Sequence, residues 1–178
     1  MWRLTSKLTP VLLIAFLFLA PTACKRKKKN AGGDEPTGLA TMLHAADPRS
    51  AVQLLRGFHT VEAGAWRWTM KSFAVTLKAP SGASAKGATL LLKFALPEII
   101  LQKLGPVTIT AKVGNTALDP QTYSAAGDQT YTRDVPASAL KDDAITVEFA
   151  LDKALPASEQ DQRELGIIMN MVGFEAKP

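Results

Sequence analysis

The chain of 178 residues contains one cysteine, Cys24, and two histidines, His44 and His59. A single thiol cannot form a disulfide within the chain. Two histidines, with the only cysteine close to the N-terminus, are too few to predict a zinc site. The sequence also lacks a phosphate-binding loop, a dinucleotide-binding fingerprint and a nucleophile elbow. It therefore predicts no metal, no cofactor and no enzymatic activity.

The chain also lacks an apolar run of the length that crosses a bilayer comfortably. The run at residues 11–20 is too short for a hydrocarbon layer of ~30 Å, which takes roughly 20 apolar residues. It follows a short basic start with Arg3 and Lys7, and it ends in small residues, as an export signal does. We therefore predict that residues 1–23 form a signal peptide.

The end of this run resembles a bacterial lipoprotein cleavage site, in which small residues precede a cysteine that is acylated and becomes the new N-terminus. Thr22, Ala23 and Cys24 match that pattern, whereas Pro21 stands where a Leu, Val or Ile is usual. The resemblance implies that Cys24 carries a lipid anchor. The alternative is that Cys24 is an incidental thiol near the end of an uncleaved anchor.

Five consecutive cations, Lys25 to Lys29, follow the cysteine. Beside an acylated Cys24 they would lie against anionic headgroups and add on the order of 1 kcal/mol per cation to membrane binding. Because Lys25 is not Asp, the retention rule of some diderm bacteria predicts transport to the outer membrane. We expect a lipid-anchored protein of the bacterial cell envelope, facing the periplasm or the surface. Positive charge beside an apolar segment also tends to stay cytoplasmic, so an uncleaved inner-membrane anchor remains the alternative.

The basic charge of the chain is concentrated at its N-terminus. Arg3, Lys7 and the cluster at 25–29 are seven of the 21 basic residues, which leaves 14 basic residues against 16 acids and a formal net charge of −2 for residues 30–178. The net charge of +5 therefore predicts no nucleic-acid-binding face. Residues 24–48 are predicted to be a basic and flexible linker, with the pattern of two helical turns at 39–46. Residues 49–178 remain as one domain.

Short strand patterns fill this domain. Alternating apolar residues or β-branched runs predict strands at 66–70, 73–77, 88–96, 107–113, 129–135, 144–151 and 165–174, with a short return strand after 116. Residues 119–128 are predicted to be a loop, and residues 97–105 fit a short helix and a bent strand equally well. Side chains expected to face the core are Phe73, Val75, Leu77, Leu90, Leu92, Phe94, Ile145, Val147, Phe149 and Leu151.

No sustained amphipathic helix and no repeat of 20 to 50 residues interrupts these strands. About eight short strands separated by turn signals predict an all-β fold. We predict an antiparallel β-sandwich, jelly-roll-like, behind the N-terminal signal or anchor segment.

Two segments resemble a known family. The first resembles the N-terminal part of a non-catalytic β-sandwich module and consists of Gly57-Phe58, Glu62 and the run Trp66 to Thr69. That module is similar in architecture to galactose-binding-like domains. It is found attached to bacterial glycosyltransferases and methyltransferases that handle cell-surface saccharides. The second, residues 155–158 and 161–167, resembles the C-terminal part of the same module. The resemblance covers about residues 50–175, although this chain has no attached enzyme and has Gly114-Asn115 where Asn-Gly is more usual. The resemblance implies a β-sandwich fold and a role close to cell-surface saccharides. It assigns no established binding residue to this chain.

Charged and aromatic residues near the two ends of the domain form the candidate ligand-binding set: Glu62, Trp66, Arg67, Trp68, Arg163 and Glu164. In one interpretation, an arginine and a carboxylate bind sugar hydroxyls while one tryptophan stacks on the sugar ring. In the other, the tryptophans belong to the core and the arginines pair with the two glutamates, which ties the first strand to the last. Two tryptophans on one face of a strand are more often core, which favours the second interpretation.

The sequence leaves three functional hypotheses. The first is a lipid-anchored, non-enzymatic envelope β-sandwich that binds saccharide or a saccharide-processing partner. The alternative is a structural or assembly lipoprotein that docks another envelope protein and has no ligand pocket. A small hydrolase with an unrecognised site is the third. An exposed aromatic side chain beside Arg67 or Arg163 would favour the first, and a flat apolar patch would favour the second.

Overall fold

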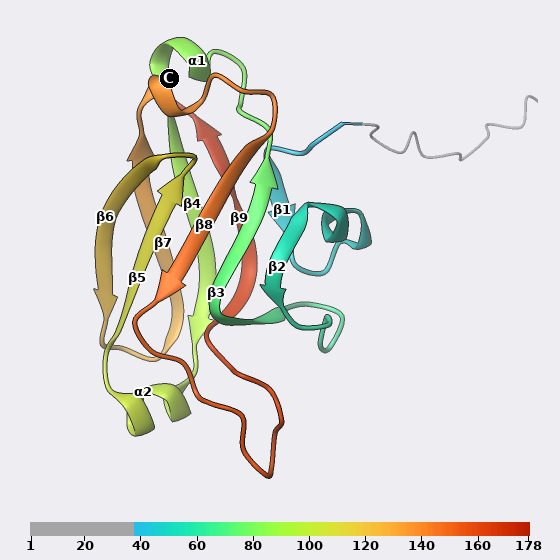
Figure 1. Ribbon diagram of the computed structural model, residues 1–178, viewed down its shortest axis with the longest axis vertical. Coiled ribbons are helices and arrows are strands. Elements are labelled where there is room, and N and C mark those ends of the chain that lie inside the picture. Colours follow the sequence, from blue (N-terminus) through green and yellow to red (C-terminus); the bar gives the residue numbers. More distant parts are fainter. Residues whose placement is uncertain (1–37) are drawn as a thin grey trace, which may run out of the picture. The chain divides into compact units, whose positions relative to one another are not determined.

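The computed structural model describes residues 38–178 (Figure 1). The predicted signal peptide, Cys24 and the basic cluster at 25–29 lie outside the described residues. The described residues form part of one compact unit.

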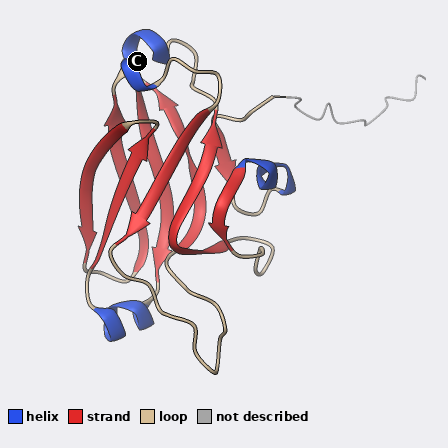
Figure 2. Ribbon diagram, in the orientation of Figure 1, coloured by secondary structure: helices blue, strands red, loops and turns tan. Residues whose placement is uncertain are grey.

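The described chain is an all-β, antiparallel sandwich of jelly-roll type (Figure 2). Nine strands make it up, against the eight or so predicted: β1 (Met42–His44), β2 (Leu54–Phe58), β3 (Arg67–Leu77), β4 (Ala88–Leu96), β5 (Val107–Val113), β6 (Thr116–Tyr123), β7 (Gly127–Val135), β8 (Ile145–Leu151) and β9 (Ile168–Ala176). Four short helical segments connect them: η1 (Pro48–Gln53), α1 (Ala83–Lys86), α2 (Glu98–Leu104) and η2 (Ala137–Ala139).

The strands form two sheets that share β3. One sheet runs β1-β9-β4-β7, and the other runs β2-β3-β8-β5-β6. Arg67 and Trp68 at the start of β3 pair with β9, whereas residues 72–77 pair with β8. The segments 66–70 and 73–77, predicted as two strands, are parts of one continuous strand that passes from one sheet to the other. β3 therefore forms a corner of the sandwich near residues 69–71.

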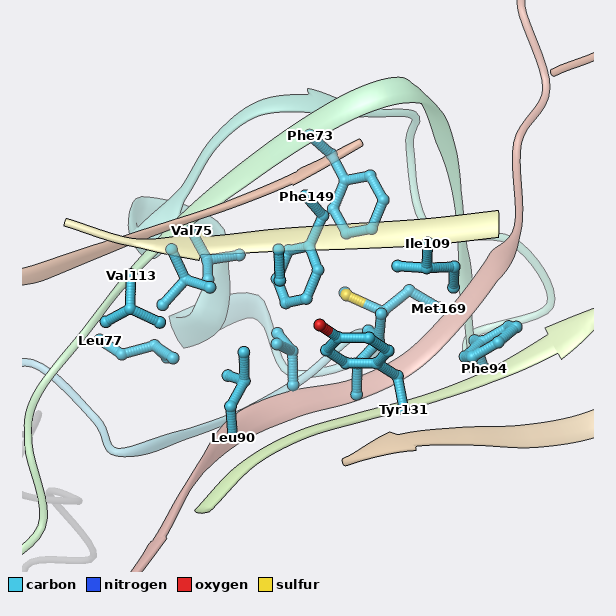
Figure 3. Packing of buried hydrophobic residues seen from close by; sticks show 14 of the residues in the cluster. Phe73, Val75, Leu77, Leu90, Phe94, Ile109, Val113, Tyr131, Phe149 and Met169 are labelled. Atoms are coloured by element: carbon cyan, nitrogen blue, oxygen red, sulfur yellow. The ribbon is translucent and has the colours of Figure 1, made fainter. Parts of the chain in front are cut away.

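The core lies between the two sheets and is rich in aromatic side chains (Figure 3). Phe73 of β3 stacks on Phe149 of β8 with ring centroids 4.9 Å apart, and Tyr131 of β7 meets Phe149 edge-on from the opposite sheet. All ten side chains predicted to face the core are buried. The period-two alternation of these strands was therefore sufficient to assign their inner faces.

The N-terminal part of the domain differs from the prediction. Residues 39–46 do not form helical turns, because Met42–His44 adds β1 to the edge of β9. Leu43 is buried in the core, and the buried Gln53 amide holds this segment in place by accepting from the Ala40 N–H and donating to the carbonyls of Ala40 and Thr76. Residues 42–48, which we assigned to the linker, therefore belong to the folded unit.

A second difference concerns residues 119–128, which we predicted to be a loop. β6 extends to Tyr123 and β7 begins at Gly127, so most of this segment is strand. β6 is an end strand of the sheet order, half exposed, and an end strand tolerates Pro120 because its outer N–H groups need no partner. The polar composition of β6 follows from this position.

Residues 97–105, which fitted a helix and a bent strand equally well, form the helix α2. Gly105 ends it with a φ of +75°, and its N–H donates to the carbonyl of Leu101 over 2.9 Å. Glycine adopts a positive φ without strain and is common just after the last turn of a helix. α2 then lies across one end of the sandwich, opposite α1 (Figure 1).

Candidate functional site

An open groove of about 690 Å³ lies at the α2 end of the sandwich. One wall comes from α2 and the other from the long segment between β8 and β9, which extends from the same end of the sandwich (Figure 1). The lining combines apolar and polar side chains: Trp68, Ile99, Lys103, Leu104, Leu155, Pro156, Ser158, Gln160, Asp161, Arg163 and Leu165. A groove of this size and composition is typical of small-ligand sites.

Trp68 reaches the groove because of the corner in β3. At this corner Thr69 turns inward and is fully buried, while Met70 is 38% exposed. The backbone N–H and carbonyl of Thr69 pair with Ile167 and Gly166, so the strand is fixed to the start of β9. Trp68, on the opposite face to Thr69, is half-buried, packs against the edge of the core and lines the groove.

The β8–β9 segment has its own internal supports. Leu155 and Leu165 form an isolated antiparallel bridge, with N–H to carbonyl distances of 2.8 and 2.9 Å. Beyond this bridge, the Ser158 N–H donates to the carbonyl of Asp161 over 2.8 Å, and this turns the tip of the segment. The tip therefore presents Ser158, Gln160 and Asp161 to the groove from a closed loop.

Arg163 is held on the groove wall by two carboxylates. Its Nε and Nη2 donate to the two oxygens of Asp161 over 2.9 and 2.8 Å, and its Nη1 donates to Glu62 over 2.5 Å. Side-on pairing of a guanidinium with a carboxylate fixes the plane of both groups. The arginine therefore links the loop tip to the β2–β3 connection, about a hundred residues away in the chain.

A tight turn between β2 and β3 brings Glu62 to this position. Glu62 and Trp66 pair as an isolated bridge, and Ala63 and Gly64 between them have φ angles of +49° and +64°. This left-handed pair matches the twist of the flanking chain in a hairpin turn. The turn directs the Glu62 carboxylate toward Arg163 of the β8–β9 segment.

The ion pairs alter the acidity of the groove wall. Hydrogen bonds from the side chain and backbone of Arg163 lower the pKa of Asp161 to about 2, and Asp161 in turn raises the pKa of Arg163. Asp161 is therefore ionised throughout the ordinary pH range. A carboxyl that donates a proton in glycoside hydrolysis needs a raised pKa, which is the opposite of this shift.

The structure brings together three of the six predicted site residues and separates the rest. Trp68, Arg163 and Glu62 meet at the groove or directly behind its wall. Arg67 points elsewhere, since its Nε and Nη1 donate to the backbone carbonyls of Ala45 and His59. Glu164 accepts from the backbone N–H of Lys71, and Trp66 is half-buried outside the groove lining.

The contacts of these six residues bear on both interpretations of the sequence. Arg163 does pair with Glu62, as the structural interpretation requires, but no ion pair joins Arg67 to Glu164 within residues 38–178. Neither tryptophan is fully buried, and Trp68 and Arg163 both line the groove. The six residues therefore include an ion pair that links distant segments, Arg163 with Glu62, and two residues that line a candidate site, Trp68 and Arg163.

Sequence reasoning missed the opposite wall of the groove and most of the loop tip. Ile99 is 43% exposed on α2, and Lys103 lies one turn further along the same helix. An exposed isoleucine in a helix whose other apolar residues face the core was the available signal. Ser158, Gln160 and Asp161 carried no signal beyond the polarity of a loop.

Other classes of site find no support in the described part of the chain. Residues 38–178 contain no group of three or more His, Cys, Asp or Glu side chains placed to bind a metal ion. Over the same residues, no helix combines the length and apolar character needed to cross a membrane. In the groove, the half-buried Trp68 lies in one lining with polar side chains that hydrogen bonds hold in place.

Comparison with known proteins adds little. No known family model matches the sequence, and no curated protein matches it. A solved structure described as "CBM4 structure and function" shares 16% sequence identity with this chain, over 75% of this chain and 81% of that chain, with a TM-score of 0.31. A similarity of this degree carries no argument about a ligand.

Proposed function

We propose that this domain is a non-catalytic saccharide-binding module and that the groove beside α2 is its binding site. The proposal rests on one observation: Trp68 and Arg163 line the same groove, and Arg163 is ion-paired with both Glu62 and Asp161. A half-buried indole offers an apolar face to the C–H surface of a sugar ring, and fixed polar groups orient the hydroxyls. The sequence resemblance to modules of saccharide-processing proteins supports the same class of ligand.

The groove lacks a feature that hydrolysis would use. Asp161, the carboxylate on its wall, has its pKa lowered to about 2 and is paired with Arg163. A carboxylate in this state binds and orients, but it does not donate a proton near neutral pH. This supports a binding role without chemistry.

We also propose that the domain acts at the bacterial cell envelope, attached through acylated Cys24 and the basic cluster at 25–29. Support comes from the sequence alone: a short apolar run, small residues and the single cysteine in that order. A lipid chain and a basic cluster together give the two signals that stable membrane attachment requires.

Binding of the full chain, purified in mild detergent, to a panel of bacterial surface polysaccharides tests the proposed function. We expect saturable binding that Trp68→Ala weakens about tenfold, because loss of aromatic stacking costs about 1 kcal/mol and neighbouring contacts also loosen. Trp66→Ala, outside the groove lining, should leave the affinity within about twofold.

Trp68 also packs against the core, so a second variant separates binding from folding. Gln160→Ala changes an exposed loop side chain of the groove and should weaken binding without lowering the melting temperature. Absence of binding across the panel would reject the proposal. A protein partner docking at η1 and β2, where Val52 and Leu55 are 82% and 49% exposed, would then be the alternative.

A further inference from the structure

Arg163 has hydrogen-bonding capacity that the protein does not use. A guanidinium carries five N–H donors, and three of these are bonded to Asp161 and Glu62. The remaining two belong to a side chain that is 36% exposed and lines the groove. A ligand in the groove can therefore accept hydrogen bonds from an arginine whose orientation is already fixed.

The charge around these two donors is negative. One guanidinium faces two carboxylates, and Asp161 is held ionised by its hydrogen bonds from Arg163. A ligand carboxylate bonded to Arg163 would be placed beside both Asp161 and Glu62, and like charges at this separation repel each other. A pair of hydroxyl oxygens accepts the same two N–H groups without this repulsion.

We infer that the groove selects neutral hexopyranoses, with two adjacent hydroxyls on Arg163, and that Glu62 and Asp161 exclude sugars carrying a carboxylate. The inference rests on the proposed saccharide-binding function and specifies its ligand class. In this arrangement Trp68 contacts the ring and Arg163 contacts the hydroxyls. Glu62 is a specificity-determining residue that touches the arginine and acts through its charge.

Lys103 on the α2 wall is the one feature that favours an acidic ligand. It is exposed, lines the groove and forms no ion pair with any residue of 38–178. An exposed ammonium is strongly hydrated and mobile, whereas the carboxylates beside Arg163 are held in place. The fixed charges on the opposite wall should therefore determine the selectivity.

The test uses matched probes: glucan, mannan and galactan, each with its C6-carboxylate form, and the full chain in mild detergent. We expect at least tenfold tighter binding of the neutral polysaccharide in the pair that binds. Glu62→Gln keeps an acceptor for Arg163 and removes one negative charge, so it should strengthen binding of the carboxylate form at least threefold and leave the neutral form unchanged. Glu175→Gln, the same substitution on β9, should leave both affinities unchanged.

The outcomes separate this inference from the proposed function. Binding of neither member of any pair would reject the inference, and it would reject the proposed function as well only if the panel of bacterial surface polysaccharides also showed no binding. Equal binding of both members, or a ratio that Glu62→Gln does not change, would reject the selectivity and leave saccharide binding in place. Tighter binding of the carboxylate form that Lys103→Gln abolishes would overturn the inference in favour of an acidic ligand.

Discussion

Thr69 is a polar residue that is completely buried at the corner of β3. Its Oγ1 accepts a hydrogen bond from the backbone N–H of Ile167 over 3.2 Å. A neighbouring glycine, Gly166, allows this approach, because a Cβ at Gly166 would lie only 2.7 Å from the same Oγ1. This contact therefore fixes β3 against the start of β9, next to Trp68 and the groove.

Replacement of the threonine by an isosteric apolar residue tests this contact. Thr69→Val should lower the free energy of unfolding by about 1–3 kcal/mol, because it leaves the buried N–H of Ile167 without an acceptor. Urea denaturation measures the change. Thr146→Val, on an exposed position of β8, is the matched control and should change stability by less than about 0.5 kcal/mol. Equal effects of the two substitutions would show that the hydrogen bond is unimportant.

At the scale of elements, the sandwich has a seam where β6 and β7 face each other as the two ends of the strand order. Side chains of β7 close it. Arg133 donates through Nε and Nη2 to the carbonyls of Asp119 and Pro120 over 2.8 Å each, and Tyr131 donates to the carbonyl of Asp119 over 2.9 Å. The Arg133 guanidinium also lies over the Tyr131 ring, 4.7 Å from its centroid. These side-chain contacts connect β6 to β7, which do not pair through backbone hydrogen bonds.

Removing the guanidinium should therefore loosen the seam. We expect Arg133→Met, which keeps the aliphatic stem, to destabilise the domain by about 2 kcal/mol because two backbone carbonyls lose a charged donor. Arg56→Met removes the exposed Arg56–Glu148 ion pair and should cost less than about 1 kcal/mol. Chemical denaturation compares the two, and a larger effect for Arg56→Met would contradict the proposed role of the seam.

For the whole molecule, the proposal of a lipid anchor at Cys24 can be tested directly. Expression of the full chain in a diderm bacterium should yield a mature protein that begins at Cys24 and incorporates labelled fatty acid. The physical reason is that one apolar run of this length gives a signal peptide and not a stable span. Cys24→Ser should abolish the label. An unlabelled protein that retains Met1 would support the uncleaved anchor instead.

The alternation of residues in the sequence was enough to locate most strands. β4 and β5 coincide with the predicted segments 88–96 and 107–113, and the side chains expected inside are buried. This succeeds because the direction of a side chain in a strand depends only on its position in a period of two. That no disulfide forms within the chain follows directly from its single cysteine.

The tertiary structure alone determined the edges and the groove. β1 and β6 are polar or short, and they are strands because a neighbouring strand offers them hydrogen-bonding partners. Trp68 is half-buried because β3 changes sheets beside it, and Arg163 meets Glu62 although 101 residues separate them. Such features depend on which distant segments pack together, and a local pattern of residues does not encode that choice.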